Sequence, residues 1–215
     1  MKSSVKAISL SGLLVLGACY AARPGPVPVE EARAPVRIVG QAVQGPVTWV
    51  TVAVRAGSAH DPVGQEGLSA LTARMLREGG AGDRTPEAVD ELLYRLGTDI
   101  EVVVGKELVT FRTAVLTEDL PVITSLLSDM FLSPGLDDSA LGRLREEAQD
   151  TLDKGILQDD EATGMEVLDD LLYAGHPYGH PVAGRGGVVS TFTADDVRRF
   201  LETRYLRSTV VLGVA

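Results

Sequence analysis

Histidine is the residue type in this sequence best suited to binding a metal or moving a proton, and the chain has three. His176 and His180 are four residues apart, a spacing that would place both rings on one face of a helix. Pro177 and Pro181 interrupt that segment, and proline does not fit within a regular helix. We therefore expect a structural turn here, not a metal site. His60 lies alone among turn-forming residues, and we expect a similar structural role for it.

The segment from Ala56 to Gly80 has the spacing of a metal-binding helix but lacks the ligands. Its sequence is AGSAHDPVGQEGLSALTARMLREGG. This order, a Gly-Ser turn and then a Gly-Leu helix start, resembles the zinc helix of the insulinase/pitrilysin metallopeptidases. In that family the helix carries an inverted His-x-x-Glu-His motif, in which the histidines bind zinc and the glutamate activates a metal-bound water. The resemblance places Ala70, Ala73 and Arg74 at the three motif positions.

These three side chains do not suit zinc. Alanine has no lone pair to donate, and arginine is a permanent cation without an acceptor. A guanidinium 4 Å from a divalent ion repels it by about 2 to 8 kcal/mol, depending on the effective dielectric. The resemblance therefore implies the frame of a peptidase without its catalytic groups, so we expect no catalytic residue and no zinc at this helix.

In the same family a third zinc ligand, a glutamate, lies on a later helix before a pair of aspartates. The matching segment here begins at Thr151 and leads to Asp159 and Asp160. Asp153 is the best match for that ligand, although its side chain is one methylene shorter, and Asp150 is the other candidate. The alternative is that both belong to a solvated acidic helix face.

The resemblance continues to the end of the chain. His176-Pro177-Tyr178-Gly179 resembles a His-Pro-Tyr-Gly segment of the family, and Tyr205-Leu206-Arg207 resembles its Tyr-Arg-Pro region. No single motif decides the match, but their order and spacing over residues 36–215 make it specific. It implies an N-terminal lobe of the insulinase/pitrilysin type, incomplete at its C-terminal end.

The elements that would position these residues can be read from hydrophobic periodicity. Residues 47–55 alternate as a strand does, and Leu68, Leu71, Met75 and Leu76 recur at helical spacing. We expect further helices at 85–96, 118–132, 137–157, 162–173 and 193–205, a hairpin at 100–115 and a closing strand at 208–214. The fold class is therefore α+β, a mostly antiparallel sheet packed against several helices.

Two of these helices have a clear apolar side. We expect Val122, Leu126, Leu127 and Phe131 of the helix at 118–132 to point inward. In the helix at 162–173, Met165, Leu168, Leu171 and Leu172 lie on one apolar side. The closing strand would leave an exposed sheet edge unless a partner or further chain covers it.

The N-terminus predicts export and lipid anchoring. Lys2 and Lys6 precede a short apolar segment that is too short to span a membrane. It ends in Leu-Gly-Ala-Cys, which resembles a bacterial lipobox and makes Cys19 the lipidation site; the alternative is an ordinary signal peptide. We expect a signal peptide at 1–18, a proline-rich tether at 19–35 and the lobe at 36–215. Tyr20 after the cysteine favours the outer membrane by resemblance to bacterial lipoproteins.

Composition excludes some functions. The chain has 215 residues, 45% of them hydrophobic, and a net charge of −10. An acidic surface argues against nucleic-acid binding. With one cysteine the chain can form no internal disulfide. No glycine-rich phosphate loop or nucleophile elbow is present.

Three functions are consistent with these features. The leading hypothesis is a lipid-anchored, non-catalytic member of the insulinase/pitrilysin family in the bacterial envelope, which supports peptide binding or assembly with a zinc-bearing homologue or a second lobe. The second is an active zinc metalloendopeptidase of the same family whose ligands come from elsewhere. The third is an envelope lipoprotein with a structural role only.

Overall fold

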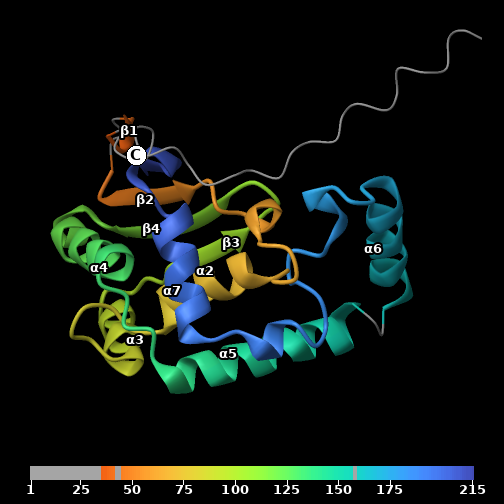
Figure 1. Ribbon diagram of the computed structural model, residues 1–215. Helices are drawn as coiled ribbons and strands as arrows, with labels where there is room; N and C mark the ends of the chain where they lie inside the picture. The colour runs from red at the N-terminus through yellow and green to blue at the C-terminus, as the bar shows by residue number, and fades with distance from the viewer. Residues whose placement is uncertain (1–34, 42–44, 157–158) are drawn as a thin grey trace, which may run out of the picture.

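A computed structural model describes residues 35–41, 45–156 and 159–215 of the chain. The predicted signal peptide, Cys19 and the predicted tether up to residue 34 lie outside the described residues. Figure 1 shows a sheet with helices gathered beside it and one helix, α6, standing apart.

The sheet has five strands in the order β1-β5-β2-β4-β3. Their bounds are β1 Arg37–Gly40, β2 Val47–Val54, β3 Glu101–Val104, β4 Val109–Leu116 and β5 Val210–Val214. The pair β1 and β5 is parallel, and the other three pairs are antiparallel. The α+β class and the mostly antiparallel pairing are therefore confirmed, although the sheet is mixed.

Alternation along the central strands sets which face of the sheet is covered. Val50, Val52 and Val54 of β2 are buried, while Trp49, the residue directly before Val50, is 58% exposed. Successive side chains of a strand point to opposite faces, so one face of β2 packs against the core and the other is open to solvent. On β4 the same alternation buries Phe111, which packs edge-on against Phe131 of helix α4.

The helices of the described residues follow the predicted order. They are α2 Leu68–Glu78, α3 Pro86–Arg95, α4 Leu120–Leu132, α5 Asp138–Asp150, α6 Asp160–Leu172 and α7 Ala194–Arg204. Short 3₁₀ turns include η1 Ser58–His60, η4 Pro177–Gly179 and η5 Val189–Thr191, and the π-helical turn η3 Thr151–Ile156 extends α5. Thr85 caps α3, and Thr193 forms a capping box with Asp196 at the start of α7.

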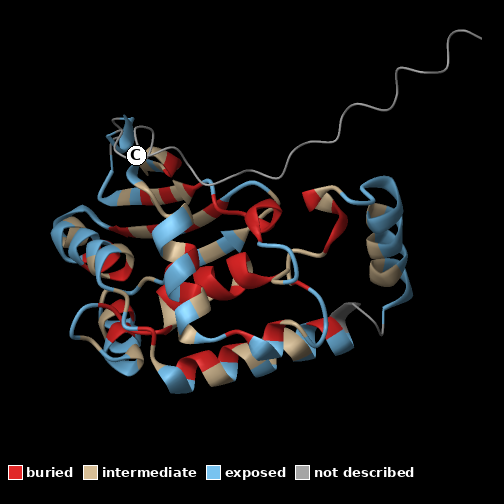
Figure 2. Cartoon of the chain, viewed as in Figure 1, coloured by how far each residue is buried: buried red, intermediate tan, exposed pale blue. Residues whose placement is uncertain are grey.

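Helix α2 lies at the centre of the molecule. All four of its predicted apolar residues, Leu68, Leu71, Met75 and Leu76, are buried, as Figure 2 shows by the red along this helix. Full burial of such a side chain contributes about 1.5–3 kcal/mol relative to leaving it exposed. The packing of these side chains in the core therefore fixes the position of the helix that carries the three motif positions.

Two sequence predictions of packing are wrong. Strand β5 is not a bare edge, because β1 and β2 pair with it on either side; residues 37–40, which the periodicity did not identify as a strand, supply that cover. Val122 of α4 is 40% exposed, since α4 turns its Ile123, Leu126, Leu127 and Met130 to the core instead.

The apolar side of α6 is open. Its residues Met165, Leu168, Leu171 and Leu172 are 57%, 45%, 73% and 67% exposed, and none of the residues of α6 is buried. The helix exists where it was predicted, but within the described residues no layer covers its apolar side (Figure 2). Helical periodicity predicts an apolar side without saying what packs on it.

Candidate functional site

The start of α2 is fixed by a buried carboxylate. Asp61 accepts hydrogen bonds from the backbone N–H groups of Gly67 and Ser69, each at 2.7 Å. These donors are among those left unpaired at a helix N-terminus, so Asp61 satisfies them from the preceding loop. Burial raises the pKa of Asp61 to about 7, although both N–H donors favour its charged form. Ser69 also donates to the Ala56 carbonyl, which ties the helix to the end of β2.

Gly67 lets a second loop approach the same helix start. Its φ of 101° lies in the left-handed region that favours glycine. A Cβ atom at this position would lie 2.7 Å from the Ala183 carbonyl oxygen and 2.8 Å from Gly184 Cα. The loop after η4 therefore packs directly on the backbone that opens α2.

The predicted motif positions lie on α2, one turn apart from first to last. Ala73 is fully buried, while Ala70 and Arg74 are half-buried. We call these three residues the ligand face. It offers two methyl groups and one guanidinium, and therefore no metal ligand and no general base.

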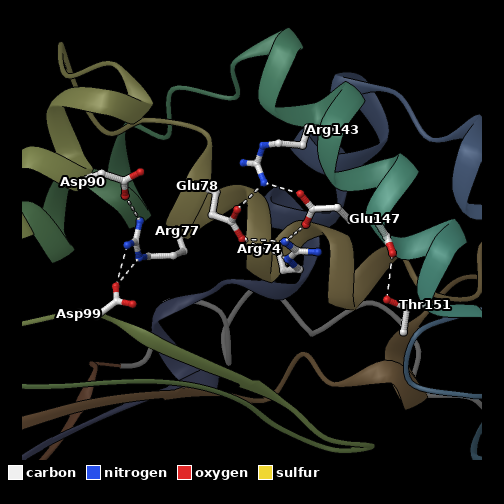
Figure 3. Close-up of polar contacts among 8 residues, drawn as sticks. All are labelled: Arg74, Arg77, Glu78, Asp90, Asp99, Arg143, Glu147 and Thr151. Atoms are coloured by element: carbon white, nitrogen blue, oxygen red, sulfur yellow. Dashed lines mark hydrogen bonds and ion pairs between the residues drawn. The ribbon is translucent and has the colours of Figure 1, made fainter. Parts of the chain in front are cut away.

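Arg74 joins α2 to α5 through a ring of four charges (Figure 3). Arg74 Nη2 lies 2.6 Å from a carboxylate oxygen of Glu147 on α5 and 3.1 Å from one of Glu78 on its own helix. Arg143 of α5 closes the ring at 2.9 Å from both glutamates. Each cation thus contacts both anions, and we call these four residues the charge ring.

The charge ring lowers the pKa of one of its carboxylates. The hydrogen bond from Arg74, and after it the one from Arg143, holds the pKa of Glu147 below its ordinary value. The four side chains are 26–47% exposed, so solvent screens each pair and the gain per pair is modest. Beside the ring, Arg77 forms separate ion pairs with Asp90 and Asp99 (Figure 3).

The His-Pro-Tyr-Gly segment forms the structural turn that the sequence favours. The 3₁₀ turn η4 begins after His176, whose Nδ1 accepts from the Tyr178 N–H at 3.2 Å. Lys106, from the β3–β4 connection, donates to the carbonyls of Tyr178 and His180 and holds the turn against the hairpin. Burial lowers the pKa of His180, which pairs with the Pro181 carbonyl at 2.9 Å.

His60 lies in η1, and its backbone N–H donates to the Gly57 carbonyl. Burial lowers its pKa. The three histidines therefore lie in or beside short turns: His60 in η1, and His176 and His180 at the two ends of η4.

The model of the insulinase family, peptidase family M16, matches residues 38–185. The chain belongs to this family. The matched residues include the ligand face, the charge ring and η4, so each part of the site described above lies within the insulinase-family domain.

Curated relatives and a solved structure agree with the family. The chain is 24% identical over 174 residues to the uncharacterized zinc protease YmxG of Bacillus subtilis, covering 77% of this chain and 40% of that protein. It is 22% identical over 180 residues to the mitochondrial-processing peptidase subunit beta of Dictyostelium discoideum, covering 84% of this chain and 38% of that one. The chain thus spans about 40% of the length of these relatives.

The fold is similar to that of a crystal structure described as a peptidase M16 inactive domain from Pseudomonas fluorescens. The TM-score is 0.75 at 21% identity, covering 82% of this chain and 42% of the other. This likeness shows that the insulinase-family fold is retained here.

Zinc is the metal that this family implies, and the donor set on α2 and α5 does not fit it. The ligand face has no atom with a lone pair that could coordinate a metal ion. In addition, the guanidinium of Arg74 lies between α2 and Glu147 of α5 and would repel a cation there. Within the described ranges, no group of three or more His, Cys, Asp or Glu side chains could hold a metal ion.

The structure also shows which α5 carboxylate meets α2. Asp153 lies in η3 and accepts from the Gln149 side chain at 3.0 Å, and Asp150 pairs with Lys154 at 2.7 Å. Both pairs are local to the helix and exposed, as in the alternative of a solvated acidic face. The carboxylate that reaches Arg74 is Glu147, which is not among the candidate ligands predicted from the sequence. Its signal was available, because Arg143 and Glu147 have the i,i+4 spacing of a helical ion pair.

Of the helices in the described part of the chain, none is both long and apolar enough to cross a bilayer.

Proposed function

We propose that this chain is a non-catalytic member of the insulinase family that supports peptide binding or assembly with a zinc-bearing peptidase partner or a second lobe. The charge ring carries the proposal. Through Arg74 and Glu147 it joins α2, which carries the motif positions, to α5, which includes Asp150 and continues as η3 to Asp153. An ion pair thus connects the helices that a shared zinc ion would otherwise connect.

The ligand face supports the loss of catalysis. Peptide hydrolysis by a zinc peptidase needs a metal-bound water and a base to deprotonate it. Ala70 and Ala73 supply neither, and Arg74 is engaged by two carboxylates. The core packing of α2 and its Asp61 cap remain, so the helix keeps its place in the fold without its chemistry.

Assembly with a partner is supported by the relatives and by the surface. A relative of similar sequence is named as a peptidase subunit, and the chain spans about 40% of the length of that protein. Helix α6 presents exposed apolar side chains, among them Leu171 and Leu172. An exposed apolar patch of this kind marks a surface for interaction.

The proposed setting is the bacterial envelope. Cys19 in its lipobox-like context would carry the lipid anchor, and the proline-rich segment after it would hold the domain away from the membrane. Replacing Cys19 with serine and measuring incorporation of labelled palmitate tests this part separately. Equal labelling of both proteins would argue against the anchor.

The central experiment is co-purification of the full chain from its own cells, with mass spectrometry of whatever it retains. The expected result is a homologue with an intact His-x-x-Glu-His motif, together with faster peptide hydrolysis when the purified chain is added back to it. A structural lipoprotein would retain no such homologue and would leave its activity unchanged.

Metal analysis of the purified chain alone distinguishes the remaining alternative. The proposal predicts no stoichiometric zinc and no peptidase activity. Stoichiometric zinc, with turnover lost on chelation, would show instead an active metalloendopeptidase whose ligands come from elsewhere.

A further inference from the structure

A cleft of about 220 Å³ lies between α7 and the segment that leads into α2. Leu68, the first residue of α2, and Phe200 of α7 contribute buried apolar side chains to its lining. The charged residues of the lining are Asp196, Arg199 and Arg204, all on α7. We call this space the α7 cleft. It places cations beside an apolar surface.

The carboxylate of Asp196 is already satisfied by the protein. Its Oδ2 accepts from the Thr193 N–H at 2.9 Å and from the Thr193 hydroxyl at 2.6 Å, within the capping box of α7. Its Oδ1 accepts from the Gln65 side chain at 3.1 Å and so joins α7 to the segment before α2. The hydrogen bonds from Thr193 hold the pKa of Asp196 below its ordinary value. Asp196 therefore fixes the two sides of the cleft and stays charged.

Arg199 contacts Asp196 only at long range. Its Nη1 lies 3.5 Å from Asp196 Oδ1, and 69% of its side chain is exposed. An exposed ion pair of this kind contributes little to stability. A guanidinium has five N–H donors, so Arg199 can turn toward an anion in the cleft at small cost.

Arg204 is half-buried at the end of α7, and burial lowers its pKa. Its charge extends to the η1 turn, where burial and then repulsion from Arg204 lower the pKa of His60. The planar fork of a guanidinium can bind both oxygens of one carboxylate through charge-assisted hydrogen bonds. With two guanidinium groups and one carboxylate, the lining is net positive in a chain whose net charge is −10.

Charge and size together select the ligand. One excess cation in the lining balances one negative charge, so a carboxylate suits the cleft better than a phosphate dianion, which Asp196 would repel more strongly. The C-terminal residue of a peptide carries its carboxylate and its side chain on the same carbon atom. That arrangement matches guanidinium groups beside an apolar lining. A glutamate side chain offers only methylenes beside its carboxylate, so the cleft favours a peptide end with an apolar last residue.

We propose that the α7 cleft binds the C-terminal residue of a peptide, with its carboxylate paired to Arg199 and Arg204. The last side chain lies against Leu68 and Phe200. The proposal rests on the proposed function only in taking the ligand to be a peptide. It gives the non-catalytic chain a preference for free, apolar C-terminal ends over internal segments, which have no such carboxylate.

An NMR titration of the full chain with N-acetyl-leucine tests this directly. Saturable shifts are expected at the amides of the lining residues Gln65, Leu68 and Thr203, with a Kd of about 1 mM, as for one residue held by charge-assisted hydrogen bonds. N-acetyl-leucinamide has the same side chain without the negative charge and should bind about tenfold more weakly. Absence of saturable shifts, or equal binding of the amide, would overturn the proposal.

Three further ligands identify which anion is bound. N-acetyl-glycine keeps the C-terminal carboxylate without the side chain, so it should bind several-fold more weakly through lost apolar contact. N-acetyl-isoglutamine, which has only a side-chain carboxylate, and inorganic phosphate should each bind about tenfold more weakly than N-acetyl-leucine. Equal binding of N-acetyl-glycine would refute the apolar contact. Equal or tighter binding of N-acetyl-isoglutamine or of phosphate would refute the assignment to a peptide C-terminus.

Two neighbouring arginines of α7 provide a matched pair of variants. Arg199→Gln removes an exposed cation of the lining and should weaken binding of N-acetyl-leucine about tenfold. Arg198→Gln is the control, because Arg198 pairs with Asp195 and lies outside the lining. It changes the net charge equally and should bind as the parent does. Equal loss in both variants would show a general effect of net charge and would refute the role of Arg199.

Arg204→Lys tests the second cation. The substitution keeps the positive charge but removes the planar fork, so binding of N-acetyl-leucine should weaken several-fold. Thermal unfolding checks that the fold is kept, and Arg199→Gln carries the test if it is not. A folded variant that binds as the parent does would show that Arg204 does not hold the carboxylate. Because these titrations use the chain alone, failure of partner capture leaves their result unaffected, and failed titration leaves capture to be judged separately.

Discussion

Arg74 of α2 and Glu147 of α5 form an ion pair with 2.6 Å between Nη2 and Oε2, at the place where the two helices meet. Arg143 and Glu78 extend this pair into the charge ring, so that each helix contributes one cation and one anion. Opposite charges alternate around the ring, and no pair of like charges has to be placed in direct contact.

The charge ring should couple the two helices energetically. In a double-mutant cycle with Arg74→Ala and Glu147→Ala, we expect a coupling free energy of about 0.5–1 kcal/mol, because both side chains are half-exposed. Urea unfolding of the four proteins measures it. The matched control combines Arg74→Ala with Asp153→Ala, whose effects should simply add. A coupling of zero for the first pair would mean that the ion pair contributes nothing to stability.

The ring should also contribute a pH-dependent part of stability. The folded-state pKa of Glu147 lies below the ordinary 4.5 because Arg74 and Arg143 donate to its carboxylate. The contribution is therefore present above the unfolded pKa and is lost as the pH falls through the folded value. In Arg74→Met the Glu147 pKa should rise toward its ordinary value, as measured by NMR of the side-chain carboxyl carbon. A pKa unchanged by the substitution would assign the shift to another cause.

Asp61 should have the opposite pH dependence. Its folded-state pKa is raised from 3.8 to about 7 by burial, so between these values the folded chain binds more protons than the unfolded chain. Stability from this group should then decrease as the pH rises through that interval. Asp61→Asn should flatten this part of the curve of unfolding free energy against pH. A parallel curve, shifted only by the lost helix cap, would show that Asp61 does not titrate there.

Restoring the motif tests the assignment of the ligand face. We expect the triple variant Ala70→His, Ala73→Glu, Arg74→His to bind zinc in a calorimetric titration, with Glu147 as the third ligand because it already reaches position 74. Adding Glu147→Gln should then weaken zinc binding at least tenfold, whereas adding Asp153→Asn should not. If Asp153→Asn weakened zinc binding and Glu147→Gln did not, Asp153 would be the third zinc ligand of the restored site.

Gly67 should tolerate substitution much less than Gly64. Both have positive φ values, 101° and 77°, but a Cβ at Gly64 would meet nothing within 4 Å. Gly64→Ala therefore isolates the backbone strain, about 1 kcal/mol, while Gly67→Ala adds a clash with the Ala183 carbonyl and should cost about 2–4 kcal/mol. Thermal unfolding compares them, and equal losses would show that the loop yields to the new methyl group.

Local patterns in the sequence predicted most elements correctly. The alternation that buries Val50, Val52 and Val54 and the spacing that buries α2 are properties of consecutive residues, as is the capping box at Thr193. Each depends on residues that are close together in the sequence, so it can be predicted without knowing how the elements pack.

The errors concern how elements meet. Nothing near residues 37–40 indicates that they pair with the distant β5, and nothing within α6 indicates that its apolar side is left uncovered. For the site, the family resemblance pointed to Asp153 or Asp150, and nothing in it indicated that the crossing of α2 and α5 brings Glu147 to Arg74. Helix crossings depend on side-chain packing from the whole core, which spacing alone does not contain.

The placement of β5 between β1 and β2 has a consequence for the order of folding. Arg37 pairs with Val211, so the first and last described strands meet across nearly the whole described chain, and β2 has no neighbour on that side until β5 arrives. Contacts this distant in sequence form late, because a long loop must close before they can stabilise anything. During synthesis the hairpin β3–β4 can pair with one edge of β2 while the other edge of β2 stays unpaired. An unpaired strand edge can form hydrogen bonds with another chain. A newly made chain is therefore most prone to aggregate, or to need a chaperone, before β5 is inserted between β1 and β2.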